Sequence, residues 1–332
     1  MAVKAYTTII PDGMKEIIFA QIGIQSKTAD KISSEFTAKI VESFKLENGP
    51  IHVDHGQFID AANYQNRIFL AYWHDAESYQ KWLEHEQVQQ WWNGHKLDAD
   101  LGLYHEVAKI PVTHFETIHS IKNNNSGVTH FLKLEETKEH AYWGSMRKRI
   151  PASSNEQFSS QLEKINAKNK ETFGKHLKAI APDNVCLIRT AQDWTRCPTD
   201  EKETYFSLVE PALQKSYQYL NTHQVESGSI NPKFVQELDE KNQPVEKTCV
   251  VSFFLSLKHL EEWTHKHPTH IALFGTFAEM LRRHNLSVQL SLWHEVSVLQ
   301  SDDLELNYIN CHPKTGFLPY VETKEIAYIQ KV

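Results

Sequence analysis

Histidines are the residues whose number and placement point most directly to chemistry in this sequence. The chain of 332 residues has 19 histidines and only 12 glycines, although glycine averages about 7% of residues in proteins. Histidine exchanges protons near neutral pH and is a common metal ligand. The excess predicts a metal or acid–base site, although histidines scattered over the surface would give the same count.

Two histidines occupy equivalent places in a sequence repeat. His294 lies in Leu-Trp-His-Glu-Val, and His105 lies in Leu-Tyr-His-Glu-Val. Successive side chains of a strand point to opposite faces, so Leu292 and His294 would share one face, while Trp293 and Glu295 share the other. If the first face lines an apolar cavity, His294 could ligate a metal; otherwise it is a core histidine held by a hydrogen bond. The repeat alone gives no reason to prefer one histidine.

Two further side chains are candidates for a role beside such a site. His312 precedes Pro313, which favours an extended conformation before it, and Gly316 permits a tight turn nearby. A histidine held in such a loop is either a candidate general acid or base or an exposed surface residue. Arg189 follows an apolar run, so its guanidinium is expected to meet a carboxylate, for which Asp193 is a candidate, or to face a polar ligand.

The densest group of histidines lies in residues 265–270. His267 and His270 would lie one helical turn apart, but Pro268 is expected to disturb the helix and no His-Glu-x-x-His spacing is present. We therefore do not expect zinc there, and His52-Val-Asp-His55 is a weaker candidate still. Glycine-rich nucleotide motifs and the Gly-x-Ser-x-Gly motif of serine hydrolases are also missing from the sequence.

Composition narrows the function classes. The chain has 35 Lys and Arg residues against 42 Asp and Glu residues, for a net charge of −7, which argues against a nucleic-acid partner. No apolar run approaches the roughly 20 residues of a membrane span, and the amino terminus does not resemble a signal peptide. We expect a soluble, cytoplasmic protein with reduced thiols, since the four cysteines form no Cys-x-x-Cys pair.

An internal repeat predicts the elements that position these residues. Residues 69–82 resemble residues 250–263, and residues 101–110 resemble residues 289–298. With strands expected over 16–24 and 51–59 and a helix over 28–44, the first half has the strand-helix-strand-strand-helix-strand order of a ferredoxin-like unit.

The second half follows the same order with insertions. Strands are expected over 141–150, 185–190, 247–257 and 286–299, and helices over 156–178, 201–221 and around Trp263. We therefore expect an α+β fold in which two ferredoxin-like repeats form a dimeric α/β barrel-type core with helices outside. The halves would be residues 1–120 and 121–332, integrated into one domain.

Several collinear motifs together resemble those of the haem-containing aldoxime dehydratases. The resemblance extends from about Glu16 to Phe317, nearly the whole chain. The motifs are Ala-Tyr-Trp-Gly-Ser-Met-Arg-Lys-Arg-Ile-Pro at 141–151, Leu-Ile-Arg-Thr-Ala-Gln-Asp-Trp at 187–194, Trp263 with His267-Pro-Thr-His270 and Phe274-Gly, Trp-His-Glu-Val at 293–296, and Tyr-Ile-Asn-Cys-His-Pro-Lys-Thr-Gly at 308–316.

The resemblance implies a homodimer with one haem b per chain, active as Fe(II), that removes water from an aldoxime, R–CH=NOH, to give a nitrile. By motif, His294 resembles the proximal iron ligand, His312 the distal histidine that protonates the departing hydroxyl, and Arg189 the arginine that supports it. The family has a serine that binds the aldoxime hydroxyl. Its place falls on Asn231 in an ungapped alignment and on Ser229 in a shifted one.

Three alternatives stay open from the sequence. The chain could be another haem enzyme of the same barrel type, such as a peroxidase or a chlorite-dismutase-like enzyme. It could also be a haem-binding protein without turnover, or a cofactor-free protein that keeps the fold. The R group of the aldoxime and its E or Z geometry are left open.

Overall fold

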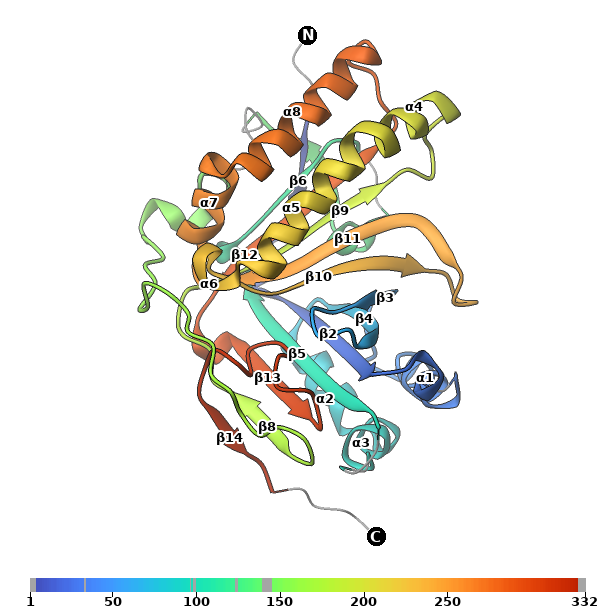
Figure 1. Ribbon diagram of the computed structural model, residues 1–332, viewed down its shortest axis with the longest axis vertical. Coiled ribbons are helices and arrows are strands. Elements are labelled where there is room, and N and C mark those ends of the chain that lie inside the picture. The colour runs from blue at the N-terminus through green and yellow to red at the C-terminus, as the bar shows by residue number, and fades with distance from the viewer. Residues whose placement is uncertain are drawn as a thin grey trace.

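The computed structural model contains one large antiparallel sheet with helices on its outer faces (Figure 1). The fold is therefore α+β, as predicted. No helix among the described residues is long and apolar enough to cross a membrane. The structure describes residues 4–32, 34–95, 97, 100–122, 125–138 and 145–327.

The first half of the chain contributes four neighbouring strands in the order β5-β2-β4-β3. The helices between them lie against one face, where Trp82 and Trp91 are buried with Ile40. The elements are β2 (Glu16–Ser26), α1 (Ser34–Ser43), β3 (His52–Ile59), β4 (Gln65–Trp73), α2 (Ala76–Glu84), α3 (Glu86–Asn93) and β5 (Gly102–Pro111).

The second half repeats this arrangement in the order β10-β11-β9-β12. Figure 1 shows α5, α7 and α8 together over these strands, at the opposite end of the molecule from α2 and α3. The elements are β9 (Val185–Asp193), α4 (Thr199–Thr204), a π-helical segment (Tyr205–Val209), α5 (Glu210–Thr222), α6 (Gln224–Ser227), β10 (Ser229–Leu238), β11 (Pro244–Phe254), α7 (Leu257–Lys266), α8 (Pro268–Arg283) and β12 (Ser291–Leu299).

The two halves exchange strands at their edges. Strands from the second half continue the first-half sheet beyond β5, and the amino-terminal strand lies beyond β12. The halves are also joined by pairing of β3 with β10, where Gln57 lies opposite Gln236. The edge strands are β13 (Leu304–Ile309), β8 (His176–Ala179) and β14 (Thr323–Glu325) beside β5, and β6 (Phe115–His119), β1 (Tyr6–Ile9) and β7 (Lys133–Glu136) beside β12.

Short 3-10 helices fill several connections between these elements. They are η1 (Ala29–Lys31), η2 (Val112–His114), η3 (Gly127–His130), η4 (Met146–Lys148), η5 (Pro151–Ser154) and η7 (Ser301–Asp303).

The largest core cluster lies between the two half-sheets. Leu70 and Tyr72 from β4 share it with Leu187 and Ala191 from β9. The alternate residue Ile188 instead packs toward the helices with Leu260 of α7. Each strand of this region therefore has one face in the centre of the molecule and one face beneath the helices, which decides where each functional side chain points.

Two predicted elements differ from the structure. The helix expected over 156–178 is wrong, because most of this segment has no regular structure and it ends in β8. Its buried side chains Phe158, Ile165 and Thr172 recur only once in seven residues, whereas a packed helix needs about three or four apolar residues per two turns. Of the strand expected over 141–150, the described residues 145–150 contain η4 instead, and residues 141–144 lie outside the described residues.

Candidate functional site

An apolar cavity lies between the second-half sheet and the helices above it. Its lining comes from β9, β11 and β12 on one side and from α5, α7 and α8 on the other, and most of it is aliphatic or aromatic, as at Leu213, Leu273 and Phe277. The enclosed volume of the cavity is about 190 Å³. A typical small-molecule pocket has roughly 300–1,000 Å³, so a bound macrocycle would extend beyond this enclosed volume while it contacts the apolar lining.

Two imidazoles reach this cavity, one from each wall. His294 comes from β12, and its neighbour on the same strand face, Leu292, also lines the cavity. The predicted alternation of β12 is therefore confirmed. His270 comes from the first turns of α8. A histidine is the axial ligand of many haem proteins, and an apolar cavity with two imidazoles fits that cofactor.

His294 lies between a carboxylate and a guanidinium. Its Nε2 lies 2.8 Å from Oε1 of Glu116, as an N–H donor to a carboxylate would, and 3.3 Å from Nη2 of Arg149. Arg149 also donates to both Glu116 oxygens, from Nε at 2.7 Å and from Nη2 at 3.2 Å. Glu116 lies on β6, which pairs directly with β12. The ring of His294 is thus oriented by an ion pair.

Burial and charge act in opposite directions on Glu116. Burial alone would raise the pKa of its carboxyl, but the charges and hydrogen bonds of His294 and Arg149 outweigh that effect and lower it. The carboxylate therefore stays ionised at neutral pH. The ionised carboxylate can accept a hydrogen bond from the His294 ring, which lies 2.8 Å away.

His270 has the contacts expected of a metal ligand. Its Nδ1 has no hydrogen-bond partner among the described residues, and its ring packs edge-on against Trp263 at a centroid distance of 4.7 Å. Burial lowers its pKa to about 4, against the opposing effect of a hydrogen bond with the Thr264 backbone. The imidazole is therefore neutral at pH 7, the form in which histidine binds metals.

The sequence reasoning gave His270 no individual role. Pro268 was expected to disturb a helix, but it stands in the first turn of α8, where its missing N–H costs nothing. His267 caps the same helix by accepting a hydrogen bond from the Thr269 backbone N–H at 3.3 Å. The segment His-Pro-Thr-His is therefore a helix start, and that pattern was the signal that could have identified His270.

Hydroxyl groups also border the cavity next to His294. Thr190 of β9 lies opposite His294 in the strand register, and both line the cavity. Its Oγ1 donates to the Trp293 carbonyl oxygen at 3.3 Å. Ser216 of α5 lines the other wall, and its Oγ has no partner among the described residues. Neither residue was predicted to belong to the site.

Arg189 lies on the opposite face of β9 from Thr190. Its Nη1 donates to the Tyr72 hydroxyl at 2.9 Å, and its Nη2 forms ion pairs with Asp54 at 2.7 Å and Glu237 at 3.2 Å. The carboxylates that it meets are thus not Asp193, the candidate named from the sequence. The side chain is buried in the central core and does not line the cavity of His294.

His312 borders a different cavity. Its Nε2 lies 2.8 Å from Oδ2 of Asp60, and its Nδ1 accepts the Lys314 backbone N–H at 3.1 Å. One ring nitrogen of His312 is therefore bonded within its own loop, and the other is bonded to Asp60, which follows β3. The structure does not bring His312, Arg189 and His294 into one cavity, although the motif resemblance groups them in one site.

The two positions expected to replace the family serine also lie away from His294. Asn231 borders the cavity of His312, and its backbone has a φ of 47°. Ser229 is fully buried, and its hydroxyl donates to the Leu220 carbonyl oxygen at 2.7 Å. Neither residue lines the cavity that contains the two imidazoles.

Aromatic side chains surround His105, the repeat equivalent of His294. Tyr79 and Trp92 pack against its ring at centroid distances of 6.1 and 5.4 Å. Burial lowers its pKa to about 4. The structure thus distinguishes the two histidines that the repeat left equivalent: aromatic side chains occupy the first-half position, while the second-half position opens into a cavity.

Known proteins resemble this chain over nearly its full length. It is 48% identical over 327 residues to the phenylacetaldoxime dehydratase of Bacillus sp. (strain OxB-1), covering 97% of this chain and 93% of that protein. It is 32% identical over 312 residues to the aliphatic aldoxime dehydratase of Rhodococcus globerulus, covering 92% and 88%. The crystal structure of an aldoxime dehydratase in complex with butyraldoxime superposes with a TM-score of 0.87 at 30% identity, covering 95% of this chain and 89% of that one. The profile of the family described as haem-containing dehydratase matches residues 20–317, and the chain belongs to that family.

Proposed function

We propose that this protein uses haem to dehydrate aldoximes to nitriles. The observation that carries the proposal is the apolar cavity with imidazoles on two walls. Relatives named for phenylacetaldoxime and aliphatic aldoximes agree with it. The substrate's R group would occupy apolar lining of the kind seen at Leu213 and Phe277.

The cofactor in this proposal is haem b, as the motif resemblance implies, and the sequence lacks the Cys-x-x-Cys-His motif that attaches c-type haem covalently. When bound in the Fe(II) state, it would supply the coordination site for the aldoxime nitrogen and the electron density that weakens the N–O bond. The residues of the chain then have to hold the group and move protons.

We assign the iron ligand to His270 and the acid–base role to His294. Nδ1 of neutral His270 has no hydrogen-bond partner among the described residues, and His294 is hydrogen-bonded to the ionised carboxylate of Glu116. The motif resemblance gives the converse expectation, in which His294 ligates iron and His312 is the acid. Substitution of His270 and of His294 distinguishes the two assignments.

The imidazole of His294 carries out both proton transfers of the proposed reaction. As the N–O bond breaks, protonated His294 gives its proton to the departing hydroxyl, which leaves as water. Neutral His294 then takes the proton from the aldoxime carbon, which completes the nitrile and restores the acid. Glu116 orients the ring and stabilises its charged form, while Arg149 holds Glu116 ionised. Such a positioned acid contributes typically about 10²–10⁴-fold in rate.

The proposal also includes the arrangement of the two halves and the oligomeric state of the protein. We propose that residues 1–120 and 121–332 are two ferredoxin-like halves that face each other across the central core as in a barrel, and that the active form is a homodimer. Ile271 and Phe274 on α8 are 51% and 47% exposed, which gives an apolar surface that suits a subunit contact. Light scattering of the purified protein measures the mass that tests this assembly.

The direct test is nitrile formation by the reduced holoprotein. We expect anaerobic, dithionite-reduced protein to convert phenylacetaldoxime to the nitrile, measured by chromatography, with little turnover of peroxide by the ferric form. A ferrous protein that binds haem but forms no nitrile would instead indicate a haem-binding protein. Rapid peroxide turnover without nitrile formation would favour a peroxidase.

A further inference from the structure

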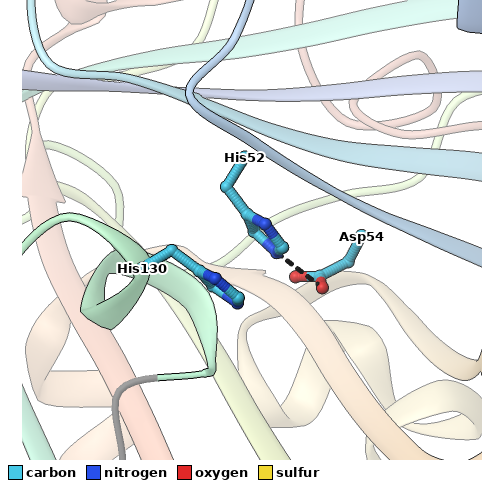
Figure 2. A group of neighbouring side chains, drawn as sticks. All are labelled: His52, Asp54 and His130. Carbon is cyan, nitrogen blue, oxygen red and sulfur yellow. Dashed lines mark hydrogen bonds and ion pairs between the residues drawn. The ribbon is translucent and has the colours of Figure 1, made fainter.

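Three potential metal ligands lie together outside the cavity described above. His52 and Asp54 are on β3, and His130 ends η3 in the segment that connects the two halves (Figure 2). One ligand atom from each residue lies within 4.8 Å of those of the other two. Nε2 of His52 is 2.8 Å from Oδ1 of Asp54. None of the three lines the apolar cavity.

The rings of the two histidines are stacked. Their centroids are 3.4 Å apart, and their planes differ by 11°. Two imidazolium ions would repel each other at this distance, so at least one ring is neutral and offers a nitrogen lone pair. His130 is exposed, which leaves a path for an ion from solvent.

The carboxylate is already held in one orientation. Oδ2 of Asp54 pairs with Arg189 at 2.7 Å, and Arg189 is fixed in turn by the Tyr72 hydroxyl at 2.9 Å. The other oxygen, Oδ1, faces His52. Outer partners of this kind orient the ligands of metal sites. The contact with Arg189 keeps Oδ1 of Asp54 directed at the stacked rings.

We propose that His52, Asp54 and His130 bind one divalent transition-metal ion at a site separate from the haem cavity. Two imidazole nitrogens and one carboxylate oxygen form a donor set that suits Zn²⁺ and leaves a coordination position for water. Calcium and magnesium prefer oxygen ligands throughout. The ion would link β3 of the first half to the connecting segment, between residues that are 78 positions apart in the sequence (130 − 52).

The test measures zinc bound to the haem-loaded protein. Wild type and His130→Ala are stripped with chelator, dialysed against buffered micromolar Zn²⁺ and digested for metal analysis, with haem iron in the same digest as the loading control. We expect one zinc per chain in wild type and its loss in His130→Ala, or an affinity reduced by about tenfold or more. Zinc should also raise the Tm of wild type but not of the variant.

His74→Ala is the matched control. His74 contacts Asp75 at 3.1 Å, but this pair belongs to no three-donor cluster among the residues that the structure describes. It should keep the zinc content of wild type. His52→Ala, which leaves the Asp54–Arg189 pair in place, should lose zinc as His130→Ala does. Equal zinc in wild type and His130→Ala, or no saturable zinc in wild type, would refute the site and leave the cluster as a hydrogen-bonded pair that orients Arg189.

Discussion

Glu116 connects the acid–base residue of the cavity to a buried cation. It accepts hydrogen bonds from Arg149 and lies 2.8 Å from Nε2 of His294, and the side chains of Glu116, Arg149 and His294 are 1%, 5% and 8% exposed. A buried charge without its partner is costly. Chemistry at His294 and stability of the fold therefore depend on the same ion pair.

The roles of the two cavity histidines can be separated by substitution. His270→Ala should lose the bound haem, because it removes the neutral imidazole with an unpartnered nitrogen. His294→Ala should keep haem, measured by absorption of the reduced protein, but lose nitrile formation by about 10²–10⁴-fold. The reverse pattern would show that His294 ligates the iron.

His312→Ala provides the contrast to these variants. With both ring nitrogens engaged by Asp60 and Lys314, its loss should lower stability and leave the ferrous spectrum and nitrile formation intact. Retained haem with abolished turnover would support the distal role that the motif resemblance gives to His312.

Glu116→Gln should lower stability in a pH-dependent way. The pKa of Glu116 is lowered in the folded protein, so its contribution is present above the unfolded pKa of about 4.3 and is lost as pH falls through the folded value. Loss of one partner of a buried pair costs about 3–5 kcal/mol. Denaturant unfolding should show this difference at pH 7 and a smaller one near pH 3. An equal difference at both pH values would contradict the ionised state of Glu116.

At the scale of elements, alternation along a strand was predictable and long-range partners were not. The pattern of residues 292–295 placed His294 on the cavity face. Glu116 and Arg149 come from segments 178 and 145 positions away, and no local signal pairs them with His294. For the same reason the sequence did not show which carboxylates Arg189 contacts, because its partners Asp54 and Glu237 belong to other strands.

The helices show where periodicity succeeds and where it fails. The helix expected over 201–221 is confirmed, but it contains the π-helical segment Tyr205–Val209 just before Pro211. This segment brings Val209 to the cavity lining. Such bulges often occur at functional sites, and apolar spacing does not predict them. The helix expected over 156–178 is wrong because the buried residues of this segment are too sparse to form a helical face.

At the scale of the whole molecule, the repeat left His105 and His294 equivalent, but the structure gives the two histidines different surroundings. Tyr79 and Trp92 contact His105 at the place where the second half has its cavity. We expect one haem per chain, measured as the pyridine haemochrome against protein concentration. His105→Ala should leave that ratio at one, whereas a ratio near two in wild type would contradict the asymmetry.

The exchange of edge strands also has a consequence for biosynthesis. β5 pairs on one side with β13, and His105 of β5 lies opposite Asn307, which is synthesised 202 positions later. Until then the nascent first half presents an unpaired strand edge, which is a template for aggregation. Ribosomes add about 5–20 residues per second, so this edge is unprotected for roughly ten seconds or more. Productive expression should therefore depend on chaperone capacity, and a fragment ending near residue 120 should precipitate.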